Sequence, residues 1–245
     1  FFSLFKRKIL YKIKKKINID LDQVHKKTLN DLFYHYGSDK ADTFKHSQEQ
    51  GHGFSKFYEQ QLKHLKEKEI KILEVGSYAG ASAASFIKYF VNSSVYCFDI
   101  NISNFVFSSK KIHVYGLDIN NEKKLKKILE KIKYETNSNF FDIIIDDGSH
   151  YLSDILFSFK TLFKYVKKGG FYIIEDFKHP NYYNHNRNIE HILVDQVLVN
   201  LQEKKIFNSD IIKNDDQVYL HNNINKIKIY KGNLKDSNIC FLQKS

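Results

Sequence analysis

Apolar runs of strand length alternate with stretches of helical periodicity through the middle of the chain. The runs predict strands at 70–76, 94–99, 112–116, 140–146 and 170–175. Helices are expected between them, at 79–90, 121–133 and 151–166, with a short helix between 99 and 112. Continuous apolar strands separated by helices are typical of βαβ units, in which a parallel sheet is covered on both faces. The pattern therefore predicts a doubly wound α/β fold.

The two ends of the chain depart from this alternation. Before it, we expect a helix over Leu21–Tyr34, an irregular loop to Gly53 and a helix over Phe54–Lys66. After it, residues 188–205 have a partly helical period. Ile224–Tyr230 and Ile239–Leu242 then flank a glycine turn and predict an antiparallel hairpin. We expect residues 1–66 to form a basic helical extension and lid segment, and residues 67–245 to form the main domain.

Acidic side chains close two of the predicted strands. One strand ends in Asp146-Asp147, followed by Gly148-Ser149-His150, and the other ends in Glu175-Asp176. The carboxyl ends of parallel strands line the ligand crevice of an open α/β sheet, so the two clusters should meet there. Carboxylates at close range repel one another unless a cation lies among them, and oxygen ligands favour Mg²⁺ or Mn²⁺. The alternative interpretation is that these are polar strand-end and helix-capping residues.

A glycine-rich turn follows the first strand of the main domain. The sequence Gly76-Ser77-Tyr78-Ala79-Gly80 leads into a helix rich in small residues. Its spacing fits neither the dinucleotide fingerprint nor the phosphate-binding P-loop. Asp99 ends the next strand, about twenty residues on, where a carboxylate is placed to accept two ribose hydroxyls. Turn and acid together predict a nucleoside ligand without phosphates.

These motifs resemble a known family. Leu73–Ser82 followed by Phe98-Asp99 resembles the S-adenosylmethionine (SAM) site of class I methyltransferases. The Asp146–His150 cluster with Glu175-Asp176 resembles the metal-dependent sugar O-methyltransferases of macrolide pathways, the mycinamicin and tylosin type. The segment that precedes the SAM fold in that group is similar to Tyr36–Lys40, Gly51–Phe54 and Tyr58 here. The resemblance implies a Rossmann-like, mostly parallel seven-stranded sheet whose last strands form a reversed hairpin.

The resemblance also implies site residues, each carried over to the matching position. For SAM the positions are Glu74, Gly76, Ser77, Tyr78, Ser82, Asp99, Asp118 and Asp146. For Mg²⁺, or Mn²⁺ in its place, they are Asp147, Glu175 and Asp176. His150 is implied as the catalytic base beside Asp147. Apart from the resemblance, His52 and His179 are candidate substrate contacts by their places in the chain, and Tyr151 is a third candidate. Around Asp118 the chain reads Gly-Leu-Asp-Ile-Asn, where relatives often carry Gly-Asp-Gln.

The function implied is methyl transfer from SAM to a sugar hydroxyl. The metal would act as a Lewis acid on two neighbouring hydroxyls, and His150 would remove the proton. We expect the sugar to be nucleotide-linked or part of a glycoconjugate, from a surface-polysaccharide or natural-product pathway. Two alternatives stay open: a methyltransferase for catechol-like phenols, and a binding protein that keeps the SAM fold without transferring methyl groups.

Charge and composition limit the other classes of function. The net charge of +11 is uneven, because Phe1–Ile19 is dense in lysine and arginine and contains no acid. As a helix this segment would be typical of a membrane-surface contact, but we favour a solvated extension. Lysines elsewhere are dispersed, so nucleic-acid binding is not expected. Two cysteines and the absence of an apolar run of about 18 residues favour a cytoplasmic protein without a membrane span, and a homo-oligomer stays open.

Overall fold

The computed structural model describes residues 16–24, 28–178 and 190–245, and its centre is one seven-stranded sheet. The strands in spatial order are β5 (Ile112–Gly116), β3 (Ser93–Asp99), β2 (Ile70–Val75), β6 (Phe141–Asp146), β7 (Val166–Glu175), β9 (Asn238–Lys244) and β8 (Ile224–Lys231). The first five are parallel, whereas β9 is antiparallel to both of its neighbours. This confirms the doubly wound sheet and its C-terminal antiparallel hairpin.

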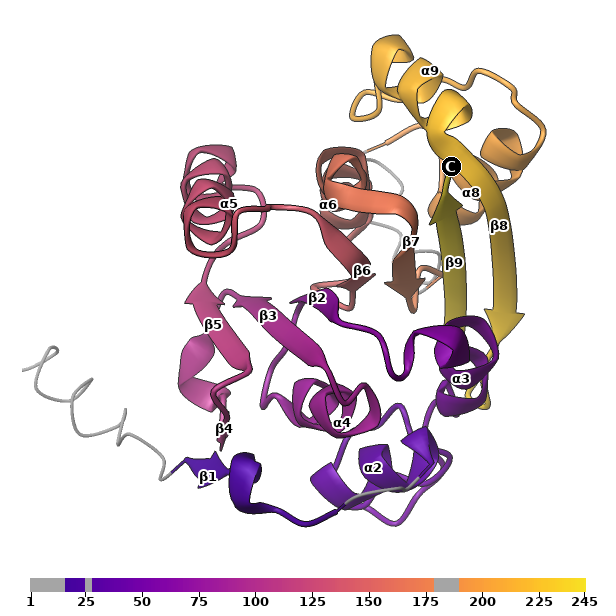
Figure 1. The fold of residues 1–245 in the computed structure, drawn as a ribbon. Coiled ribbons are helices and arrows are strands. Elements are labelled where there is room, and N and C mark those ends of the chain that lie inside the picture. Colours follow the sequence, from indigo (N-terminus) through magenta and orange to yellow (C-terminus); the bar gives the residue numbers. More distant parts are fainter. Residues whose placement is uncertain (1–15, 25–27, 179–189) are drawn as a thin grey trace, which may run out of the picture.

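Helices cover both faces of the sheet (Figure 1). One face carries α5 (Glu122–Thr136), α6 (Leu152–Leu162), α8 (Val194–Gln202) and α9 (Asn214–Asn223). The other carries α2 (Leu29–Tyr36), α3 (Ser55–Leu62) and α4 (Ala81–Tyr89). Within β2, Leu73 and Val75 pack on the first face while Ile70 and Ile72 pack on the second. Side chains alternate along a strand, so a run of apolar residues supplies two cores at once.

The leading segment packs against the sheet through α2 and α3. A capping box starts α2, with Thr28 accepting from the backbone of Asp31 and Asp31 accepting in return. Phe33 of α2 and Tyr58 of α3 are both fully buried against Phe86 of α4, each with ring centroids 5.5 Å from that ring. Burying an aromatic or aliphatic side chain of this size stabilises the fold by roughly 1.5–3 kcal/mol. The segment thus shares a core with the main domain, and its role as a lid stays a prediction.

Several elements differ from the expected ones. The first long helix begins at Leu29 because Thr28 caps it, and the expected start at Leu21 is instead the end of a 3₁₀ turn, η1 (Ile19–Leu21). Helix α9 was not predicted, since its ten residues are mostly polar. Strand β7 begins four residues early, through a polar Lys-Lys-Gly-Gly stretch and an irregular register against β6. A two-residue strand, β1 (Ile17–Asn18), also pairs with β4 (Phe107–Ser108).

Shorter turns complete the described elements. The 3₁₀ turns are η2 (Lys63–Leu65), η3 (Ile102–Asn104) and η4 (Phe163–Tyr165). Most of the basic segment 1–19, for which membrane-surface contact was considered, lies outside the described residues, as does the start of the expected helix 188–205. Within the described ranges, every helix is too short or too polar to cross a membrane.

Candidate active site

The glycine turn after β2 brings the backbone of two neighbouring strands into contact. Gly76 has a φ of 83°, and a Cβ on it would lie 2.0 Å from the carbonyl oxygen of Asp147. A side chain there would collide with backbone, which cannot move aside cheaply. Gly80, with a φ of 80°, then begins α4. Glycine at Gly76 therefore allows the ends of β2 and β6 to form one continuous wall.

A cavity of about 280 Å³ opens above this wall, and we call it the cofactor cavity. The ends of β2, β3, β5 and β6 line it. Among its lining residues are Gly76, Tyr78, Asp99, Asp118 and Asp147. The structure thus brings together four of the eight sequence-predicted SAM contacts, Gly76, Tyr78, Asp99 and Asp118. It does so at the carboxyl ends of the strands, where ligands of open α/β sheets bind.

Asp99 organises the floor of the cofactor cavity. Its Oδ2 accepts a hydrogen bond of 2.7 Å from the backbone N–H of Tyr78, and its Oδ1 accepts one of 2.7 Å from Asn101. Tyr78 has a positive φ of 41°, so this bond holds the glycine turn in a conformation that non-glycine residues rarely adopt. Asp118, whose Oδ1 accepts from the backbone of Asn120, also lines the cavity, after the neighbouring strand β5.

Glu74 and Ser82, also predicted as SAM contacts, form a buried pair beneath the turn. The Ser82 hydroxyl donates to Oε1 of Glu74, whose side chain is completely buried. Oε2 of Glu74 has no hydrogen-bond partner among the described residues. Burial raises the pKa of Glu74 to about 7, an effect that the nearby Lys40 ammonium opposes. Ser77 and Ser82 line a second cavity, of about 290 Å³, together with Lys40.

Asp146 lies apart from the other acids of the two clusters. Its carboxylate accepts a hydrogen bond of 3.1 Å from the hydroxyl of Tyr172, which lies 2.9 Å from the hydroxyl of Ser158 on α6. Burial raises the pKa of Asp146 to about 6. Successive strand residues point to opposite faces, so Asp146 turns toward the core while Asp147 turns toward the crevice. Asp146 is not among the residues that line the cofactor cavity.

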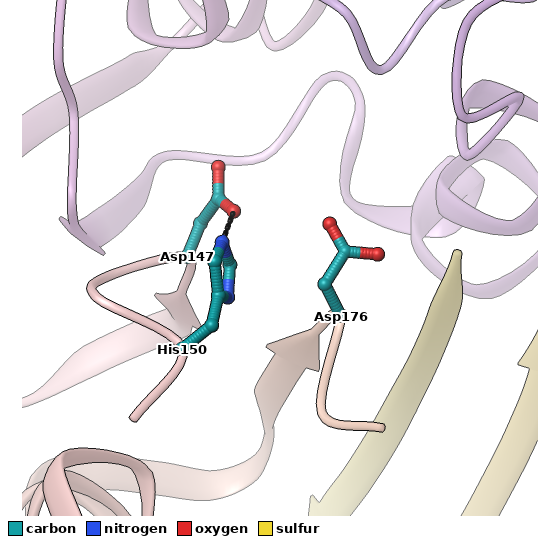
Figure 2. A group of neighbouring side chains, drawn as sticks. All are labelled: Asp147, His150 and Asp176. Carbon is teal, nitrogen blue, oxygen red and sulfur yellow. Dashed lines mark ion pairs between the residues drawn. The ribbon is translucent and has the colours of Figure 1, made fainter. Parts of the chain in front are cut away.

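Asp147, His150 and Asp176 converge across the crevice. One ligand-type atom from each lies within 4.8 Å of the others. Figure 2 shows Asp147 and His150 on the loop after β6, with Asp176 facing them from the end of β7. His150 Nε2 lies 3.8 Å from Oδ1 of Asp147. Oδ1 of Asp176 is buried and has no hydrogen-bond partner among the described residues.

The backbone at this group is strained. His150 has a φ of 57° and Asp176 a φ of 49°, both in the left-handed region. Non-glycine residues in this region cost on the order of 1–3 kcal/mol each and cluster at functional sites. Two carboxylates, one imidazole and an unsatisfied buried oxygen are a donor set that suits a divalent cation. The residues present therefore fit the predicted metal.

Glu175, the third predicted metal ligand, lines the same cavity as this group, but its two oxygens are bound by other side chains. Its Oε1 accepts from the hydroxyl of Tyr58, and its Oε2 accepts a hydrogen bond of 2.5 Å from Nζ of Lys40. The same ammonium donates to Oδ2 of Asp147. Burial alone would lower the pKa of Lys40, but Asp147 and Glu175 raise it well above its ordinary value. Lys40 is therefore a charged ammonium held between two of the predicted ligands.

A third cavity, of about 450 Å³, contains the Asp147, His150 and Asp176 group, and we call it the acidic cavity. His52 is part of its wall, with Nδ1 3.4 Å from Oδ2 of Asp176 and 2.8 Å from the hydroxyl of Ser237. Burial opposes protonation of His52, but the hydrogen bond and charge of Asp176 outweigh burial and raise the pKa of the imidazole.

The other predicted substrate contacts have different positions. Tyr151 caps the start of α6, is half-exposed, and is not among the residues that line the acidic cavity. His179 lies outside the described residues. Sequence reasoning assigned no role to Lys40, Tyr58 or Ser237. Lys40 and Tyr58 belong to the segment whose resemblance was noted, which was the one signal available, since their partners lie more than a hundred positions away.

Comparison with known proteins connects this geometry to a family. No protein-family model matches the sequence. Mycinamicin VI 2''-O-methyltransferase from Micromonospora griseorubida is 29% identical over 132 residues, which cover 51% of this chain and 31% of that protein. L-olivosyl-oleandolide 3-O-methyltransferase from Streptomyces antibioticus is 30% identical over 132 residues, covering 51% and 32%. The match thus spans about a third of the length of these curated relatives.

Solved structures show the same likeness in the fold. The MycE methyltransferase of the mycinamycin pathway, solved in complex with Mg and SAH, superposes with a TM-score of 0.66 at 22% identity. The superposition covers 90% of this chain and 55% of that one. A second structure of MycE, which also holds mycinamycin VI, gives a TM-score of 0.64. The chain therefore has the class I methyltransferase fold and is similar in sequence to the macrolide-type sugar O-methyltransferases.

Proposed function

We propose that this protein is a SAM-dependent and divalent-metal-dependent O-methyltransferase that acts on a sugar hydroxyl. One observation carries the proposal: Asp147 lines both the cofactor cavity and the acidic cavity. A methyl donor in the first cavity and an acceptor in the second would share one wall, as direct transfer between them requires. Much of the rate enhancement in such a transfer comes from holding the two reactants in line.

On the donor side, the chain's own residues supply positioning. The glycine turn admits a ligand close to the backbone of Gly76, and the carboxylate of Asp99 is placed to accept ribose hydroxyls. Asp118 lines the same cavity, after the neighbouring strand. SAM bound here would supply a methyl group already activated by its positive sulfur.

On the acceptor side, the chain would supply a base and cation ligands. Asp147, Asp176 and His150 surround the place where a cation fits. A divalent cation bound there would lower the pKa of a coordinated sugar hydroxyl. His150, whose Nε2 lies 3.8 Å from Oδ1 of Asp147, would be the base that takes up that proton. The predicted role of Glu175 as a further ligand is part of this proposal.

The character of the acidic cavity favours a sugar over a catechol. Its lining is mainly polar, with Asp39, His52, Lys235 and Asp236 around the central acids. An apolar clamp, which a flat phenol would need, is missing from the described lining. Asp39 and His52 come from the leading segment, which supports the predicted lid role of that segment. Named relatives act on glycosylated macrolides, so we propose a sugar carried by a larger molecule, with nucleotide-sugars as the second acceptor class.

A turnover experiment tests this function. The protein is incubated with SAM and Mg²⁺ against glycosylated macrolides, nucleotide-sugars and catechol, and products are examined for the mass of one added methyl group. We expect methylation of a sugar, loss of turnover with EDTA, and recovery with Mg²⁺ or Mn²⁺. Turnover of catechol alone would contradict the sugar assignment. Binding of SAM without turnover of any acceptor would favour the binding-protein alternative.

A further inference from the structure

The ammonium of Lys40 is the one buried lysine charge placed among the acids of the described site. Its side chain is 3% exposed and it contacts both Asp147 and Glu175. Glu74 and Asp39 lie close enough to raise its pKa further. Isolated buried charges are costly, whereas a charge that is paired on two sides is retained. The position of Lys40 therefore depends on the same carboxylates that are predicted to hold the metal.

The backbone around Lys40 is fixed independently of those carboxylates. The carbonyl oxygen of Lys40 accepts a hydrogen bond of 2.9 Å from the N–H of Phe54. The carbonyl oxygens of its neighbours Asp39 and Ala41 accept from His52 and Gly53, at 2.8 and 3.0 Å. This ladder holds the loop after α2 against the residues that begin α3. These hydrogen bonds fix the backbone that positions the Lys40 side chain in the site.

Lys40 occupies carboxylate oxygens at the place where a divalent cation would bind. Of the three carboxyl groups predicted to hold the metal, the Lys40 ammonium contacts two, those of Asp147 and Glu175. Lys40 uses Oδ2 of Asp147 and Oε2 of Glu175, which are oxygens that an ion could otherwise bind. Oδ1 of Asp147 lies 3.8 Å from Nε2 of His150, and Oδ2 of Asp176 lies 3.4 Å from Nδ1 of His52. Oδ1 of Asp176 has no hydrogen-bond partner among the described residues.

We infer that Lys40 is a positioning residue that competes with the divalent cation for Asp147 and Glu175. When no ion is bound, its charge holds the two carboxylates together and stabilises the fold. When an ion binds, the same charge repels it and withholds two carboxylate oxygens, so that the affinity is lower than three free acids would give. This inference rests on the proposed function, because it concerns the metal site of that function.

Direct metal binding tests the inference without methyl transfer. Mn²⁺ binding to the full chain is measured by calorimetry or electron paramagnetic resonance, with neither SAM nor acceptor, for the wild type and Lys40→Met. Methionine keeps an unbranched side chain and removes the charge. We expect Lys40→Met to bind Mn²⁺ at least tenfold more tightly and, without metal, to melt at a lower temperature. Lys40→Arg should remain near the wild type in both measurements. Lys63→Met, the same change at an exposed position of η2, should alter neither.

Some outcomes would overturn the inference. A folded Lys40→Met that binds Mn²⁺ within threefold of the wild type, or more weakly, contradicts competition. If that variant does not fold, Lys40→Met combined with Glu175→Gln removes both charges of the pair, a change that is often nearly neutral for stability. Glu175→Gln alone is the control, because it lacks the same carboxylate. The double variant should bind Mn²⁺ more tightly than Glu175→Gln, and equal or weaker binding contradicts the inference. If neither wild type nor variants bind Mn²⁺, the metal-dependent function fails with it.

Discussion

The cofactor cavity and the acidic cavity lie side by side but are built differently. The cofactor cavity is formed by residues at the ends of four parallel strands, and its central acid, Asp99, is tied to backbone N–H groups close to it in sequence or on the adjacent turn. The acidic cavity draws Asp39 and His52 from the leading segment, Asp147 and Asp176 from two strand ends, and Ser237 from the hairpin turn. Its carboxylates contact the Lys40 ammonium and the His52 imidazole, both from that leading segment.

This difference separates two ways of making a site. Strand ends place the donor side through local geometry, and any sequence that forms the sheet forms that crevice. The acceptor side needs charged side chains from distant segments to meet. These side chains can be buried there because they are paired with groups of opposite charge. Changes on the acceptor side should therefore affect catalysis most, and changes on the donor side should affect binding.

The largest expected effect is the loss of turnover when His150 is replaced. Asparagine tolerates the left-handed backbone of that position, so His150→Asn removes the base with little strain. We expect turnover to fall by about 10²–10⁴-fold with SAM affinity nearly unchanged. His150→Ala should lose as much turnover and also some thermal stability. If the asparagine variant folds normally and keeps more than about a third of the wild-type rate, His150 is not the base and serves the fold instead.

A smaller effect, on the affinity for SAM, is expected when Asp99 of the cofactor cavity is replaced. Asp99→Ala removes the acceptor for the ribose hydroxyls and should weaken SAM binding by ~1–3 kcal/mol. The substitution also frees the N–H of Tyr78, so Asp99→Asn, which keeps an acceptor, is the matched control. Calorimetric titration with SAM measures both variants, and melting temperatures without SAM report the cost to the turn. Equal SAM affinity in wild type and Asp99→Ala would place the ribose elsewhere.

The last expected effect is on the stability of the fold and concerns the buried carboxyl of Glu74. Burial raises the pKa of Glu74 to about 7, above its ordinary value of 4.5. A raised pKa means that the folded state holds the proton more tightly, so this contribution to stability is complete below pH 4.5 and is lost as pH rises through 7. Glutamine does not ionise, so the Glu74→Gln variant should not lose this stability as the pH rises.

Denaturant unfolding of the metal-free protein measures the Glu74 effect. The free energy of unfolding of Glu74→Gln should exceed that of the wild type by close to zero at pH 4.5 and by on the order of 3 kcal/mol at pH 8. Other acids titrate in both proteins and largely cancel from the difference. If the difference in free energy of unfolding between the two proteins is constant with pH, the pKa of Glu74 is the same in the folded and unfolded states, and burial does not raise it.

The sequence predicted the donor side better than the acceptor side. The runs that end at Val75 and Asp99 are continuous and apolar, so their register as buried strands follows from local pattern, and their ends define the crevice. The acid clusters were expected to converge as four carboxylates. In the structure Asp146 turns into the core toward Tyr172, since neighbouring strand residues face opposite sides. Whether Glu175 binds metal stays a prediction.

By itself the sequence determined the doubly wound sheet, the glycine turn and the C-terminal hairpin, because hydrophobic period, glycine conformation and turn residues act over a few positions. Tertiary structure alone decided which charges meet. Lys40 reaches Asp147 and Glu175 across separations of 107 and 135 residues, and Tyr58 reaches Glu175 across 117. No local period encodes such contacts, since they depend on how the leading segment packs against α4. The cost of burying charge makes those pairings obligatory once the packing has placed them.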